Sequence, residues 1–200
     1  GENGVEYRPC SGSSCGCSII VDHVQIRCNS TSGTGRHHRW IVAVDGQNST
    51  VSTTNYNRPS VSRVVGMVDS DNDGYSDVVI EGRDFGGPVW SAVDGPYVDG
   101  ITYGPSGTEY PALNCNVVSH YRIECQTSPG VGSDLKWSVT VDEQVSDLSD
   151  VVTNYAPPRI TSITTDLGET QGQTTHVING TNLGVNVPGS YVSVLFDGVP

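Results

Sequence analysis

The chain contains an internal repeat of about one hundred residues, and this repeat limits its possible folds more than any other feature. The segment from Cys28 to Trp40 aligns without gaps with the segment from Cys125 to Trp137, 97 residues further on. A second block, residues 80–86, matches residues 178–184 at a spacing of 98 residues. A spacing that recurs in this way indicates one structural unit used more than once.

The repeat boundaries predict one complete domain and two partial ones. Residues 59–157 form a whole repeat, whereas residues 1–58 match only its C-terminal part and residues 158–200 only its N-terminal part. Each partial segment alone would leave strand edges and apolar faces uncovered. We therefore expect copies of the chain to meet head to tail, so that residues 158–200 of one copy and residues 1–58 of the next complete a composite domain. Either a peptide bond in a longer repetitive chain or non-covalent strand exchange would make this junction.

Composition and local pattern predict an all-β protein. The chain has 24 Gly and 11 Pro, which suit short strands joined by tight turns, and it shows no amphipathic helical period. Residues 137–141 alternate large apolar with small polar side chains, so Ser138 and Thr140 are expected to face outward from a half-buried strand. Several such strands within one repeat, separated by turn residues, are typical of an immunoglobulin-like sandwich.

Short motifs at fixed places in the repeat carry a resemblance to a known family. They are Pro59-Ser-Val61, VIEGRDFGG at 79–87, IECQTSPG at 123–130, Tyr155 and Pro158-Arg-Ile160. These motifs resemble the IPT/TIG family, the immunoglobulin-like domains of plexins, hepatocyte-growth-factor-type receptors and many large surface proteins. The resemblance covers nearly the whole chain and implies tandem IPT/TIG sandwich domains, one complete and one composite, with disulfide-stapled strands. It implies no active site, since such domains serve as spacers, adhesion modules or cores of assemblies.

Six cysteines at short spacings favour disulfides formed in an oxidising compartment. Zinc is the alternative, but the spacing of Cys15 and Cys17 does not match a zinc knuckle, and no His lies at a matching offset. Six cysteines permit fifteen pairings. Because each would close a short loop, we predict the disulfides Cys10 to Cys15, Cys17 to Cys28 and Cys115 to Cys125.

Three Asn-x-Ser/Thr sequons predict N-linked glycans. They begin at Asn29, Asn48 and Asn179. Together with the cysteines, they predict an extracellular or cell-surface location.

The charge balance argues against a nucleic-acid partner. The chain has 10 Lys and Arg against 22 Asp and Glu, a formal net charge of −12, which repels phosphate backbones. Intracellular relatives in the IPT/TIG family bind DNA, and the acidic charge and the sequons argue against that role here. No apolar run is long enough to span a bilayer, so we expect no membrane insertion within this segment.

An acidic turn is a candidate calcium site. Residues 69–77 place carboxylates at alternate positions around a turn that Gly74 permits, as calcium loops do. The expected ligands are Asp69, Asp71, Asp73, Asp77 and a backbone carbonyl near Tyr75. The alternative is a solvated acidic turn, because the aligned residues 168–172 lack this set of carboxylates. Any bound calcium would be structural.

The remaining polar and aromatic residues favour structural roles. The basic residues 36–39 align with a turn, so exposed charge is favoured over anion or glycan binding. His23 and His120 align with each other, and we expect local packing roles. The aligned pairs Trp40 with Trp137 and Tyr56 with Tyr155 favour core positions over sugar stacking. No Ser-His-Asp arrangement, nucleotide loop or catalytic carboxylate pair is present, so we expect no enzymatic activity.

The sequence therefore predicts a non-catalytic structural module of an extracellular glycoprotein filament or surface appendage, which assembles head to tail. A ligand-binding or adhesion ectodomain of a receptor is the alternative, and an accessory domain of a carbohydrate-active enzyme is a third hypothesis. Only the basic turn and the acidic loop offer a patch unique to one repeat.

Overall fold

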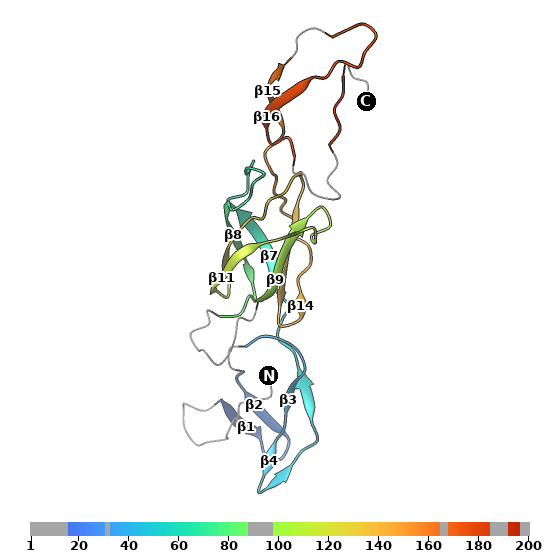
Figure 1. Ribbon diagram of the computed structural model, residues 1–200. Coiled ribbons are helices and arrows are strands. Elements are labelled where there is room, and N and C mark those ends of the chain that lie inside the picture. Colours follow the sequence, from blue (N-terminus) through green and yellow to red (C-terminus); the bar gives the residue numbers. More distant parts are fainter. Residues whose placement is uncertain (1–15, 31–32, 88–97, 165–167, 185–191, 197–200) are drawn as a thin grey trace. The chain divides into compact units, whose positions relative to one another are not determined.

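The protein is all-β, as predicted from its sequence. The computed structural model describes residues 16–30, 33–87, 98–164, 168–184 and 192–196 (Figure 1). Within these residues there are sixteen strands and no helix, and all paired strands are antiparallel. The chain divides into two compact units, Gly1–Asn57 and Arg58–Pro200, and each is described by itself.

Two four-stranded sheets form a β-sandwich within residues 59–157, which we call the complete domain. The first sheet has the strand order β11-β12-β8-β7 and the second has the order β10-β9-β13-β14. The strands of the first sheet are β7 (Ser60–Val65), β8 (Asp77–Arg83), β11 (Leu113–Ser119) and β12 (Arg122–Gln126). Those of the second are β9 (Val98–Gly104), β10 (Tyr110–Pro111), β13 (Lys136–Val141) and β14 (Gln144–Val145).

One hydrophobic core lies between these two sheets. Strand β8 buries alternate residues, and its Ile80 lies opposite Ile123 of β12, with both side chains fully buried. From the other sheet, the indole of Trp137 stacks on the ring of Tyr103 with ring centroids 4.3 Å apart. The Trp137 Nε1 donates a hydrogen bond to Thr153 Oγ1 at 2.9 Å, so the one polar atom of the indole is satisfied inside the core.

Ser138 is buried, which corrects the prediction that it faces solvent. The turn at residues 105–108 explains the difference. Thr102 lies directly opposite Ser138 and donates a hydrogen bond from Oγ1 to the carbonyl of Gly107, and Gly107 lies against the side chain of Leu148. This turn therefore covers part of the outer face of the sheet.

Residues 1–57 contain three separate two-stranded pairs in their described part. The pairs are β1 (Cys17–Val21) with β2 (Gln25–Cys28), β3 (His38–Trp40) with β6 (Ser52–Thr54), and β4 (Ala43–Val44) with β5 (Gln47–Asn48). Towards the C-terminus, β15 (Arg159–Thr164) pairs with β16 (Val177–Thr181). None of these four pairs belongs to a larger sheet among the described residues.

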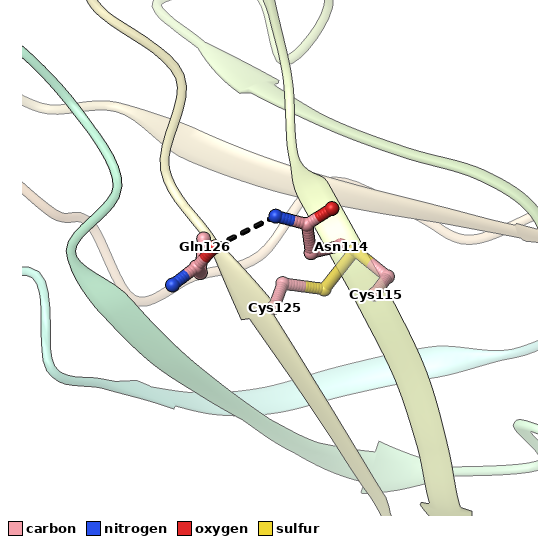
Figure 2. The surroundings of a disulfide bond; sticks show 4 residues. All are labelled: Asn114, Cys115, Cys125 and Gln126. Atoms are coloured by element: carbon pink, nitrogen blue, oxygen red, sulfur yellow. Dashed lines mark hydrogen bonds between the residues drawn. A yellow bond between two sulfur atoms is a disulfide. The ribbon is translucent and has the colours of Figure 1, made fainter.

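Two cross-strand disulfides are formed, in agreement with the predicted pairings. Cys17 and Cys28 lie directly opposite each other on β1 and β2. Cys115 and Cys125 join β11 to β12 at a β-bulge, where Asn114 and Cys115 together oppose Cys125. The Asn114 Nδ2 donates to Gln126 Oε1 at 2.8 Å beside this disulfide (Figure 2). The predicted pair Cys10 to Cys15 lies outside the described residues.

Candidate functional site

The N-terminal partial repeat reproduces local structure of the complete domain. Its Trp40 Nε1 donates to Thr54 Oγ1 at 2.7 Å, and the aligned Trp137 Nε1 donates to Thr153 Oγ1 at 2.9 Å. The two-residue pairings of Ala43–Val44 with Gln47–Asn48 and of Thr140–Val141 with Gln144–Val145 have the same register. The two segments thus share a backbone conformation as well as a sequence pattern.

The C-terminal partial repeat matches the start of the complete domain in the same way. A Cβ on Gly180 would lie 2.1 Å from the carbonyl oxygen of Arg159, and one on the aligned Gly82 would lie 1.9 Å from that of Ser60. Both positions require glycine because the facing strand approaches too closely for a side chain. This shared close approach explains why the glycine recurs at a spacing of 98 residues.

The partial repeats differ from the complete domain in what they expose. Ile26 is 44% exposed, whereas its aligned residue Ile123 is fully buried, and Val44 is 67% exposed, whereas Val141 is 1% exposed. The described part of residues 1–57 exposes nine large aliphatic side chains: Ile19, Ile20, Val21, Val24, Ile26, Ile41, Val42, Val44 and Val51. Three of them, Ile26, Val42 and Val44, align with residues that form part of the core of the complete domain.

The C-terminal segment has a similar uncovered surface. Ile178 is only half-buried, although the aligned Ile80 is fully buried. Further exposed apolar side chains are Ile160, Ile163, Val177, Val192, Val194, Leu195 and Phe196. These residues and those of the N-terminal segment are the candidate functional surface, because nothing in the described residues covers them.

The predicted calcium ligands do not converge in the structure. Among the described residues, no group of three or more His, Cys, Asp or Glu is placed to hold a metal ion. Asp77 instead accepts a hydrogen bond from Gln126 Nε2 at 3.1 Å, and the amide of Tyr75 donates to the carbonyl of Thr127 at 2.7 Å. Calcium binding by Asp69, Asp71, Asp73 and Asp77 stays a prediction from the sequence.

All three sequon asparagines are exposed. Asn29 follows β2, Asn48 ends β5 and Asn179 lies in β16. The structure therefore leaves each side chain open to modification. All three lie in the partial repeats, and none in the complete domain.

The basic turn makes local hydrogen bonds. The amide of His37 donates to Asn55 Oδ1 at 2.8 Å, and His38 Nε2 lies 2.7 Å from the carbonyl oxygen of Thr34. Arg36 and Arg39 are exposed. In the complete domain, the aligned residue Asp134 makes the same bond, from its amide to Asn154 Oδ1. The turn is therefore a shared element of the repeat.

A buried tyrosine cluster was missed by the sequence reasoning, which singled out Tyr155 alone. The Tyr103 and Tyr155 hydroxyls lie 2.6 Å apart, and Tyr155 donates to the carbonyl of Ser128 at 2.5 Å. Burial, and then the hydrogen bond with Tyr103, raises the pKa of Tyr155 far above its usual value. Tyr155 thus remains a neutral donor at physiological pH, and the cluster fixes the loop at Ser128 rather than forming a reactive site.

No family model, curated protein or solved structure matches the chain. Within the described part of the chain, no helix is long and apolar enough to cross a membrane.

Proposed function

We propose that this chain is a non-catalytic structural repeat module of an extracellular glycoprotein filament or surface appendage. Its domains are proposed to be IPT/TIG-type immunoglobulin-like sandwiches. The observation that carries the proposal is that each partial repeat exposes side chains whose aligned residues lie in or against the core of the complete domain, among them Ile26, Val42 and Val44 in one and Ile160, Ile163 and Ile178 in the other. The partner that fits each partial repeat is then the other partial repeat of a neighbouring copy.

Burial of this apolar surface supplies the driving force for assembly. Full burial of one Ile or Val side chain contributes about 1.5–3 kcal/mol. Ile26 and Ile178 are two of several such residues that would pass from partial exposure to a core. The unpaired strand edges would also gain backbone hydrogen bonds. Once paired, these edges would no longer be open to nonspecific pairing with other chains.

The geometry of this contact favours an open array. The N-terminal surface of one copy binds the C-terminal surface of another, so the contact is heterologous. A heterologous contact that does not close into a ring propagates as a filament. The complete domain then alternates with composite domains along the array.

An extracellular location is supported by the disulfides and the exposed sequons. The two disulfides indicate folding in an oxidising compartment. We expect N-linked glycans on Asn29, Asn48 and Asn179 in material from the native source, because all three side chains are exposed. Intact-mass measurement before and after glycosidase treatment checks this, and an unchanged mass together with three unmodified asparagines contradicts the glycoprotein proposal.

Size measurement under native and denaturing conditions tests the assembly. Light scattering and electron microscopy of native material are expected to show particles many times the 21.2 kDa mass of one chain. Reducing, denaturing electrophoresis then separates the two kinds of junction. Collapse to the single-chain mass indicates strand exchange, and a far larger band indicates a continuous repetitive chain. A discrete native monomer with both partial repeats closed on each other contradicts the proposal.

A further inference from the structure

In the first sheet of the complete domain, one strand pairing has no equivalent among the described residues of the partial repeats. Strands β7 and β8 correspond to β15 and β16, and strands β11 and β12 correspond to β1 and β2. Both outer pairs are thus already formed as two-stranded sheets. The central pairing between β8 and β12 joins them in the complete domain, and the corresponding pairing would be between β16 and β2.

We infer that β16 of one copy pairs antiparallel with β2 of the next copy, in the register of β8 with β12. This inference rests on the proposed head-to-tail assembly and specifies its seam. In the complete domain, Ile80 lies opposite Ile123 and Val79 opposite Glu124. At the aligned positions, Ile178 lies opposite Ile26, Val177 opposite Arg27, and Asn179 opposite Gln25.

This register assigns consistent chemistry to the two faces of the seam. The core face receives Ile26 and Ile178, whose aligned residues Ile123 and Ile80 are fully buried. Because side chains alternate along a strand, the outer face receives Arg27 and Val177 together with the sequon residues Asn29 and Asn179. Both glycans would therefore project away from the core. A shift of one strand by one residue would place the isoleucine of that strand on the outer face and its glycosylated asparagine on the core face.

The second sheet continues across the junction in the same manner. Val194 and Phe196 are separated by one residue, as Ile101 and Tyr103 of β9 are, and on this spacing we align Val194 with Ile101 and Phe196 with Tyr103. Strand β9 places Tyr103 opposite Trp137 and Ile101 opposite Val139. The same pairing places Phe196 opposite Trp40 and Val194 opposite Val42. Phe196 is 84% exposed in the single chain, so stacking on the Trp40 indole would remove one of its largest uncovered side chains from water. Each copy would then contribute strands to both sheets of the composite domain.

Disulfide cross-linking tests the register. The amide of Gly82 donates to the carbonyl of Tyr121, so these two residues form a hydrogen-bonded pair of β8 and β12. Hydrogen-bonded and non-hydrogen-bonded pairs alternate along antiparallel strands, so Val79 and Glu124, three positions along, form a non-hydrogen-bonded pair. The Cα atoms of such a pair approach to about 4.5 Å, within the range that a disulfide spans. The variant Val177→Cys/Arg27→Cys is therefore expected to form disulfides between residue 177 of one copy and residue 27 of the next, located by peptide mapping. Neither position faces the core, so neither substitution removes core packing.

A matched control places the second cysteine out of register. In Val177→Cys/Gln25→Cys, both cysteines lie on the same outer face but two residues apart in register. We expect roughly tenfold less cross-linking in this control, because diagonal neighbours lie too far apart for a disulfide. Variants that carry only one of the new cysteines measure how much cross-linking comes from exchange with the native disulfides.

The outcomes separate the seam from the assembly. If native particles form but the 25–177 pair cross-links to the same extent as the 27–177 pair, the inferred register is wrong while the proposed assembly stands. If light scattering of the unsubstituted protein shows only particles of the mass of one 200-residue copy, the assembly itself fails. Preferential 27–177 linkage within one copy rather than between copies overturns the inference, since the two partial repeats would then close on themselves.

Discussion

Replacing Trp137 with alanine is expected to destabilise the complete domain by about 3–5 kcal/mol. The side chain is fully buried, stacks on Tyr103 and donates a hydrogen bond to Thr153. Its removal leaves a cavity between the sheets and takes away one hydrogen bond from the Thr153 hydroxyl, which keeps its bond to the carbonyl of Leu135. Domains of this size are stable by only about 5–15 kcal/mol. Urea unfolding followed by circular dichroism measures the change.

Trp40→Ala is the matched control for this substitution. Trp40 makes the same hydrogen bond, to Thr54, but it is only half-buried in the single chain. In dissociated protein we expect Trp40→Ala to cost much less than Trp137→Ala, whereas in assembled material the two costs should become comparable. Equal losses from both substitutions in dissociated protein would mean that the N-terminal segment already has a closed core.

The second large effect is expected from Ile26→Asp, which should prevent assembly while leaving the complete domain folded. The residue aligned with Ile26 is fully buried, so the composite domain would have to bury an unpaired carboxylate. We expect a cost of about 3 kcal/mol or more, which is a roughly hundredfold loss of affinity between copies. Light scattering measures this loss when the junction is non-covalent. In a continuous chain, the readout is proteolytic cleavage within residues 16–54.

Val24→Asp supplies the control for Ile26→Asp. Val24 is 82% exposed and lies two residues away, but its aligned residue Tyr121 is also exposed, at 65%. The composite domain would therefore leave Val24 in water, and the added charge should change assembly little. If Val24→Asp and Ile26→Asp impair assembly equally, the surface acts through general hydrophobicity or net charge, and not as the missing half of a sandwich.

The repeat made much of the local structure predictable from the sequence. Alternation along residues 137–141 identified Trp137 as a core residue, and the structure buries it fully. The short loops between cysteines predicted both disulfides that lie in the described residues. Such features depend on contacts between neighbouring strands, and the order of residues along the chain records them directly.

The candidate surface was only partly predictable. Alignment of the two partial repeats predicted that each would lack a partner, and the exposed Ile26 and Phe196 are consistent with that expectation. The pairing register at the seam required the observed pairing of β8 with β12. Sequence alignment gives equivalent positions, but it does not state which strands are neighbours in a sheet.

The sequence by itself predicted the all-β class, the repeat and the two cysteine pairs that lie in the described residues, Cys17 with Cys28 and Cys115 with Cys125. The tertiary structure alone decided the order of strands in the two sheets, the burial of Ser138 under the turn at 105–108, and the contact of Tyr103 with Tyr155. Among the described residues, it places no group of three or more His, Cys, Asp or Glu to hold a metal ion, and calcium binding by residues 69–77 stays a prediction. The physical reason is the range of the interactions. Strand alternation is a local property, whereas covering a face or gathering side chains depends on segments that are distant in the chain.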